Sequence, residues 1–163
     1  MKAIFYTLFV AALLFSCSED ESLAWSEECS CYVPFETDIQ KIRYGTSFGF
    51  CLGYCNHELN VTAGNINYSA YSVRDNVTYP DIDCHAINEN WVDLISLIDE
   101  QGFVQLDEII GCPDCADGGA EWVEITDSGG SKQVTFEYNK APATLDSLVK
   151  VLRLSIVSFD DCN

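Results

Sequence analysis

The most reactive side chains of this chain are its cysteines, and two of them, Cys112 and Cys115, stand in the sequence CPDC. This spacing is typical of proteins that exchange thiols and disulfides. An active pair needs a thiol with a lowered pKa, which a helix N-terminus or a nearby cation commonly provides. Here Asp114 and Asp117 place negative charge beside the thiols, and two glycines then lead into an alternating apolar strand. We therefore predict a structural corner, with thiol redox activity as the alternative.

Histidines close to other cysteines raise a metal site as a further alternative. Cys55 and His57 form one such pair and Cys84 and His85 a second, and thiolate and imidazole are ligands that zinc prefers. The separations match no common zinc module, and an oxidising compartment favours disulfides. The sequence therefore assigns no metal ligand, no cofactor and no catalytic residue. Metal binding by these pairs together with the CPDC cysteines stays as the alternative.

The first residues have the pattern of a secretion signal. Lys2 is its positive end, and Ala3–Phe15 is apolar but too short to cross a hydrocarbon core of about 30 Å as a permanent helix. The last four residues up to Cys17, LFSC, resemble a bacterial lipobox, which has a branched residue three positions before the cysteine and a small one directly before it. We expect residues 1–16 to be removed and Cys17 to carry lipid, which would attach the protein to a membrane.

The residues that follow Cys17 are acidic. Ser18–Ser22 reads SEDES and resembles the export tag of surface lipoproteins in some Gram-negative bacteria. Short charged runs also serve as solvated tethers, which would leave the protein facing the periplasm. We expect residues 17–28 to form a tether and the protein to be an outer-membrane lipoprotein exposed on the cell surface, with the periplasmic orientation as the alternative.

The acidic balance extends over the whole chain, which has 26 acidic and 8 basic residues and a formal net charge of −18. Nucleic-acid affinity comes chiefly from Lys and Arg that neutralise phosphates, so this charge excludes a nucleic-acid partner. A cationic partner would suit it. Without residues 1–16 the chain has 163 − 16 = 147 residues, the length of one domain, which we place at residues 29–163.

The cysteine count indicates disulfides. Nine cysteines minus the lipidated one leave eight, and an even number in an exported chain is typical of a disulfide framework. Eight cysteines allow too many pairings for the sequence to choose among them. Cys162 is an attractive partner for Cys29 or Cys31, because such a bond would tie both chain ends to the domain. The candidates are Cys29, Cys31, Cys51, Cys55, Cys84, Cys112, Cys115 and Cys162.

Alternation of apolar and polar residues predicts five strands. They span Gln40–Tyr44, His57–Thr62, Ile66–Tyr71, 122–125 and 134–138. Turn residues at 63–65 and 127–130 join the second strand to the third and the fourth to the fifth, which gives two hairpins. Arg74–Asp83 is polar and is expected to be a loop.

Two further segments have helical periodicity. Apolar residues recur at helical spacing over Trp91–Ile98, with Asn88 as a suitable N-cap and Gly102 as a stop. Residues 145–156 carry an amphipathic stripe, with Pro142 in the expected first turn. The element order predicts the α+β class: a two-layer, disulfide-stapled domain with an antiparallel sheet built from hairpins and two helices packed on one face.

One segment resembles a known family. Residues 51–55, CLGYC, precede a hairpin, a helix and Phe103–Leu106, and this order is similar to an uncharacterised bacterial domain that opens with a C-F-G-x-C-P-x-Y motif on a strand. The resemblance covers residues 40–110, with Leu52 in place of the Phe and Asn56 in place of the Pro. It implies the fold and an uncharacterised lipoprotein, and it carries no activity.

These features predict a non-catalytic binding or cell-envelope module, exported as a lipoprotein, with a protein or a small molecule as its partner. The alternative is a thiol-redox or metal-dependent protein that uses the CPDC motif with nearby cysteines and histidines.

Overall fold

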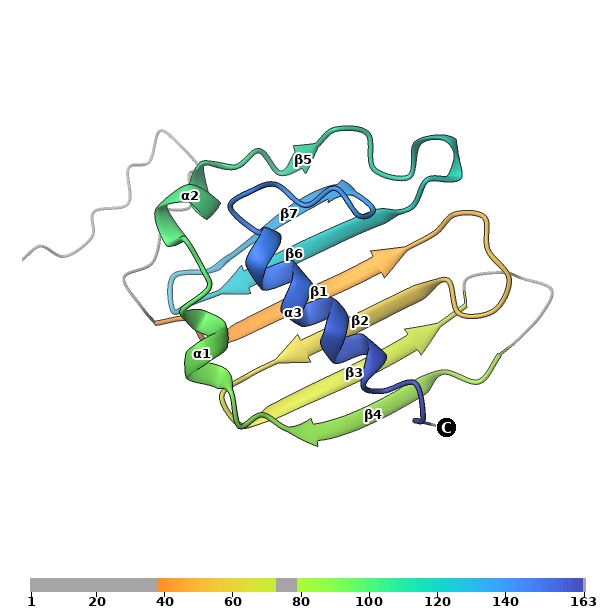
Figure 1. Ribbon diagram of the computed structural model, residues 1–163, viewed down its shortest axis with the longest axis horizontal. Helices are drawn as coiled ribbons and strands as arrows, with labels where there is room; N and C mark the ends of the chain where they lie inside the picture. The colour runs from red at the N-terminus through yellow and green to blue at the C-terminus, as the bar shows by residue number, and fades with distance from the viewer. Residues whose placement is uncertain (1–37, 73–78, 163) are drawn as a thin grey trace, which may run out of the picture. The chain divides into compact units, whose positions relative to one another are not determined.

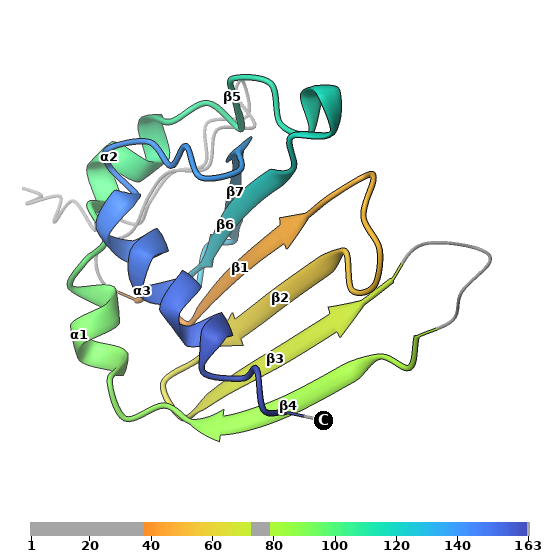
Figure 2. The same cartoon turned by 45° about the vertical axis from the view of Figure 1, so that its right-hand side comes forward.

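The alternating segments pair into one seven-stranded sheet with the strand order β4-β3-β2-β1-β6-β7-β5 (Figures 1 and 2). The computed structural model describes residues 38–72 and 79–162, all within one compact unit, Cys31–Asn163. The strands are β1 (Lys41–Ser47), β2 (Asn56–Val61), β3 (Asn65–Tyr71), β4 (Ile82–Ile87), β5 (Ile109–Ile110), β6 (Ala120–Thr126) and β7 (Ser131–Glu137). With the helices and disulfides described below, the α+β class and the disulfide staples are confirmed.

The sheet is mixed rather than antiparallel, because β5 runs parallel to β7. The cause lies in the segment before β5. Helix α2 (Glu100–Gln105) lies beside the start of β7, since the Lys132 ammonium donates to the carbonyl oxygens of Val104 and Leu106. The chain therefore leaves α2 at the end where β7 begins and runs along β7 in the same direction.

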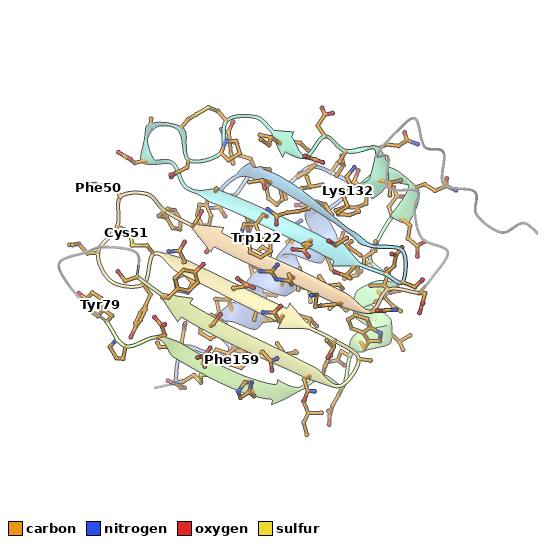
Figure 3. The ribbon with its side chains drawn as sticks, turned by 180° about the vertical axis from the view of Figure 1, so that it is seen from behind. Phe50, Cys51, Tyr79, Trp122, Lys132 and Phe159 are labelled. Atoms are coloured by element: carbon orange, nitrogen blue, oxygen red, sulfur yellow. A yellow bond between two sulfur atoms is a disulfide. The ribbon has the colours of Figure 1, made fainter. Side chains whose placement is uncertain are left out.

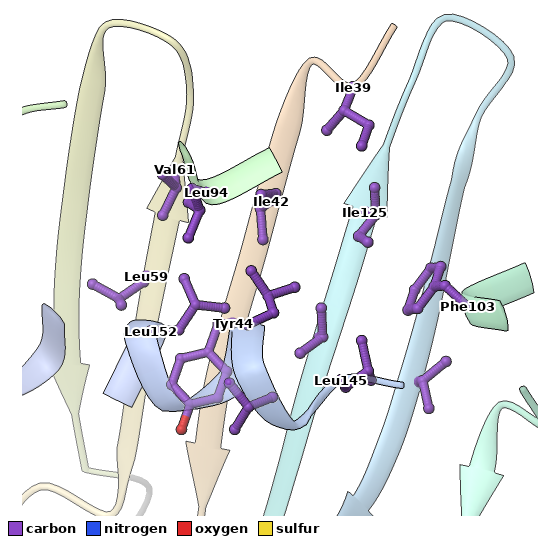
Figure 4. Close-up of a cluster of buried hydrophobic side chains, with 14 of the residues drawn as sticks. Ile39, Ile42, Tyr44, Leu59, Val61, Leu94, Phe103, Ile125, Leu145 and Leu152 are labelled. Carbon is purple, nitrogen blue, oxygen red and sulfur yellow. The ribbon is translucent and has the colours of Figure 1, made fainter. Parts of the chain in front are cut away.

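Strand β1 is the middle strand of the sheet, with β2 on one side and β6 on the other. Tyr44 lies opposite Leu59 on β2 and opposite Val123 on β6. Most side chains on this face of the sheet are apolar and almost fully buried, and Figure 4 shows them gathered into one cluster with residues of α3 (Asp146–Val157). Alternation thus gives the sheet one apolar face, and burying that face drives the packing.

Helix α3 lies across this apolar face, as Figures 1 and 2 show. Its Leu148, Val149 and Leu152 are buried in the shared core, so the predicted amphipathic stripe is confirmed. The expected place of Pro142 is wrong: it lies in a turn before the helix, where its carbonyl oxygen accepts a hydrogen bond from the Leu145 N–H (2.8 Å). No helix in the described ranges is long and apolar enough to span a membrane.

The expected single helix from Trp91 to a stop at Gly102 is wrong. Two short helices occupy this region, α1 (Trp91–Ile95) and α2, and Gly102 lies inside α2. Asp99 caps α2, because its Oδ1 accepts from the Gly102 N–H (3.0 Å), whereas Asn88 caps neither helix with its side chain. A Cβ on Gly102 would lie 2.4 Å from the Asp99 carboxylate, so the absence of a side chain at Gly102 allows Asp99 to approach closely enough to cap the helix.

Strand β4 was not predicted, and its first two residues fall in the expected loop. Cys84 faces the core while its neighbours Asp83 and His85 are exposed, so buried and exposed residues alternate here. Cys84 is the one buried residue of this strand. A charged residue such as Asp83 on an edge strand discourages pairing with other chains. The strand is also mostly exposed, so its sequence lacks the clear apolar alternation that identifies the other strands.

The opposite face of the sheet is polar. Arg43 forms ion pairs with Glu58 on β2 (2.6 Å) and with Glu124 on β6 (2.7 Å). The Trp122 ring lies on this face directly over Gly45, where an added Cβ would come within 2.4 Å of the indole (Figure 3).

Candidate functional site

The loops at one end of the sheet carry the disulfides. Because neighbouring strands are antiparallel, β1, β3 and β7 end here and β2, β4 and β6 begin here. The described residues contain three disulfides, all at or near this end: Cys51–Cys55, Cys84–Cys162 and Cys112–Cys115. We call the region formed by residues 48–55, 79–81 and 111–119 the disulfide end.

The connection from β1 to β2 is a short loop closed by the Cys51–Cys55 bond. The two cysteines are four residues apart with Cα atoms at 5.7 Å, and Gly53 between them has φ +92°, which glycine adopts at little cost. Phe50 and Leu52 are 69% and 90% exposed. The β1–β2 connection therefore presents two large apolar side chains on the surface, Leu52 inside the disulfide-closed loop and Phe50 directly before it.

The CPDC corner is also a small disulfide ring, since Cys112 bonds to Cys115. Asp114, Ala116 and Asp117 adopt left-handed backbone conformations with φ between +54° and +59°, which non-glycine residues rarely adopt. The prediction that Cys112 and Cys115 are disulfide-bonded is confirmed, and their structural role stays a prediction. Its acidic neighbours would raise the energy of a thiolate, and the 3₁₀ turn that follows is too short to supply a helix N-terminus.

Direct contacts join the corner, the β1–β2 loop and residues 79–80. The Gly49 N–H donates to Asp114 Oδ1 (3.3 Å), and a Cβ on Gly119 would lie 2.4 Å from the Phe48 ring. On the other side the Tyr54 hydroxyl donates to the Pro80 carbonyl (2.9 Å), and its ring lies 5.6 Å from that of Tyr79. The three segments thus form one continuous surface, and Phe50, Cys51 and Tyr79 gather at this end in Figure 3.

Acidic side chains are exposed on two of the three segments of the disulfide end. Asp81 lies on residues 79–81, and Asp114 and Asp117 lie on the CPDC corner. Lys140, a cation at the same end, is paired with Glu137. That hydrogen bond, together with one from the Cys112 N–H (3.1 Å), lowers the pKa of Glu137, so this carboxylate holds the corner to the end of β7.

His57 lies beside this region with both ring nitrogens engaged. Nε2 lies 3.1 Å from the Tyr54 carbonyl oxygen, so it must carry the proton and donate, and Nδ1 accepts from the Tyr68 hydroxyl (2.7 Å). Burial lowers the pKa of His57 and favours this neutral ring. The Tyr68 ring stacks on Phe159 with 5.3 Å between ring centroids, and Phe159 lies three residues before Cys162, which bonds to Cys84. This histidine is structural.

A buried charged cluster, which the sequence did not reveal, holds α3 to the sheet. Glu121 on β6 is fully buried, and its carboxylate accepts from Arg153 Nε (2.6 Å), from the Tyr44 hydroxyl and from the Asn139 N–H (3.1 Å). The hydrogen bond to Glu121 raises the pKa of Arg153, and burial raises that of Tyr44. The available signal was a glutamate at a core position of an alternating strand, with an arginine near the apolar stripe of the last helix.

The metal alternative finds no support in the described ranges. Cys55, Cys84, Cys112 and Cys115 are all in disulfides, and no three or more His, Cys, Asp or Glu side chains there are grouped closely enough to hold a metal ion. His57 and His85 are instead hydrogen-bonded to Tyr68 and Asn67.

The expected pairing of Cys162 with Cys29 or Cys31 is wrong, because Cys162 bonds to Cys84. The stacking of Phe159 on Tyr68 brings the end of the chain to β3, next to β4. Cys17, Cys29 and Cys31 lie outside the described residues, as do the secretion signal and the acidic tether. The chain matches no protein-family model, and no curated protein matches it in sequence.

Proposed function

We propose that this chain is an exported lipoprotein whose α+β domain binds a partner through the disulfide end and performs no catalysis. One observation carries the proposal: Leu52 is exposed inside the loop that the Cys51–Cys55 bond closes, and Phe50 is exposed directly before that loop. Binding residues are commonly presented on loops that a rigid scaffold positions. A loop already fixed in one conformation loses little entropy on binding, which favours affinity. The two-layer arrangement, with helices on one face of the sheet, is the scaffold we propose.

The anchoring and the location are part of the same proposal. The LFSC sequence that ends at Cys17 supports a lipid anchor in the outer membrane, and the acidic residues after it support display on the cell surface. Cys17→Ser should move the protein from the membrane fraction to the soluble fraction. Replacing Glu19, Asp20 and Glu21 by Ala should leave the lipidated protein facing the periplasm, where protease added to intact cells does not reach it.

The binding function is tested by site-specific photo-crosslinking on intact cells. A photoactivatable amino acid at Leu52 should give a discrete crosslinked adduct. The same amino acid at Ile87 is the matched control, because Ile87 is 78% exposed and lies at the opposite end of β4. Adducts of equal yield at both positions, or none at Leu52, would overturn the proposal that the disulfide end binds a partner.

A further inference from the structure

We propose that the partner of the disulfide end is a cationic polypeptide segment that carries an apolar side chain. This inference rests on the proposed function, since it assumes that this surface binds. It specifies what kind of partner binds. This follows from the exposed apolar side chains, from the sign of the charges and from the distribution of these groups over separate segments.

The apolar part of the surface is preorganised. Leu52 projects from the ring closed by the Cys51–Cys55 bond, Phe50 directly precedes this ring, and Tyr79 is 39% exposed on the neighbouring connection, against Tyr54. Large exposed apolar groups on a rigid loop lose unfavourable contact with water when a partner's apolar side chain covers them. Aromatic rings at such a place also attract cations on their faces.

The charged part of the surface has one sign. Asp81 lies on the same connection as Tyr79, Asp114 and Asp117 lie on the neighbouring CPDC corner, and Lys140 is neutralised by Glu137. With a net charge of −18 for the whole chain, an acidic partner is repelled both at long range and at contact. A basic partner is steered toward the surface and is held there by ion pairs around the apolar contact.

The spread of these groups favours a polypeptide over a metal ion. The carboxylates come from separate segments, and the described residues contain no group of acidic, cysteine or histidine side chains tight enough to coordinate a cation. The surface runs continuously from the corner through Gly49 and Phe48 to Tyr54 and Pro80. An extended chain contacts several such points at once, with basic residues placed on either side of an apolar one.

Selection of peptides from a random twelve-residue display library, with the full chain in its oxidised form as bait, tests the inference. Selected sequences should combine Lys or Arg with Leu, Phe or Trp. A synthetic copy of the strongest binder should bind Leu52→Ser about tenfold more weakly, the size typical of an anchor residue. Asp81→Asn combined with Asp117→Asn should weaken it several-fold and reduce its dependence on salt.

Matched controls lie at the opposite end of the sheet. Ile87→Ser removes a side chain that is 78% exposed, and Glu89→Gln combined with Asp93→Asn removes two exposed charges near α1. These controls should leave binding unchanged. Near-ultraviolet circular dichroism identical to that of the parent protein confirms that each variant is folded.

The outcomes separate the inference from the proposed function. Peptides without basic residues that still depend on Leu52 would overturn the cationic partner and leave the binding surface intact. Peptides that bind Leu52→Ser as well as the parent protein would overturn both, as would a selection that enriches no sequence. Binding that the Glu89 and Asp93 controls weaken equally would show attraction to net charge alone and would overturn the inference.

Discussion

Arg153 on α3 and Glu121 on β6 form a two-point ion pair, Nε to Oε1 at 2.6 Å and Nη2 to Oε2 at 2.5 Å, under the only helix of three turns in the described ranges. The carboxylate is fully buried while the guanidinium side chain is 29% exposed. The charge of Glu121 therefore depends on partners supplied by three different elements of the chain. This dependence leads to the first prediction.

Arg153→Met should lower the free energy of unfolding by about 3–5 kcal/mol, because it leaves the Glu121 carboxylate buried without its counter-charge. The matched control is Lys150→Met, which breaks the exposed Lys150–Asp146 pair on the same helix. An exposed pair is worth at most about 1 kcal/mol. Urea denaturation of both variants checks the difference. Equal losses would contradict a stabilising role for the buried pair.

The three disulfides should contribute unequally to stability. Cys84 and Cys162 are 78 residues apart, whereas Cys51 and Cys55 are four apart. Loop-closure entropy gives about 4.5 kcal/mol for the long loop and about 2 kcal/mol for the short one. The Cys84→Ser, Cys162→Ser double variant should therefore melt at a lower temperature than the Cys51→Ser, Cys55→Ser variant. The reverse order, measured by calorimetry, would contradict the entropic argument.

Stability should depend on pH through His57. Its folded pKa lies below the ordinary value of 6.5, mainly because burial disfavours the charged ring, so the unfolded chain binds a proton more readily. The contribution of the neutral His57 ring to the free energy of unfolding is therefore complete above pH 6.5 and is lost as the pH falls below that value. His57→Gln should weaken this pH dependence of the melting temperature, with His85→Gln on exposed β4 as the control. If the melting temperature of His57→Gln changed with pH as steeply as that of the parent protein, His57 would not be the group responsible.

Gly45→Ala should destabilise the sheet, because the added Cβ would lie 2.4 Å from the Trp122 indole. Overpacking of this kind costs about 1–3 kcal/mol. The control is Gly64→Ala, since a Cβ at Gly64 meets no atom within 4 Å. Trp122→Val should relieve the cost in the Gly45→Ala background. A double variant no more stable than Gly45→Ala alone would show that the indole is not the cause.

Both predicted hairpins were correct because their strands alternate cleanly around turn residues. β2 and β3 bury Leu59 and Tyr68 in register, and β6 and β7 bury Val123 and Val134 in the same way. Two other strands were missed. β4 is an edge strand in which only Cys84 is buried, and β5 is two residues long and exists because α2 delivers the chain beside β7.

The boundaries of α1 and α2 were not predictable from the sequence. Gly102 has the composition signal of a helix end, yet it lies within α2, where the Asp99 cap needs the space. For the disulfide end, the cysteine count predicted that Cys112 and Cys115 form disulfides, but the sequence left their pairing open. The partner of Cys162 was not predictable either, because it depends on where α3 crosses the sheet and where Phe159 meets Tyr68.

The bond between Cys84 and Cys162 also determines whether fragments separate after a protease cuts the chain between them. The exposed stretch around Ile109, which is 67% exposed, lies between these two cysteines in the sequence. A single cut there divides the backbone, but the two fragments remain one molecule. On a denaturing gel the nicked protein should migrate as the intact chain without reductant and as two bands with it. Cleavage in this part of the chain therefore cannot by itself shed either piece.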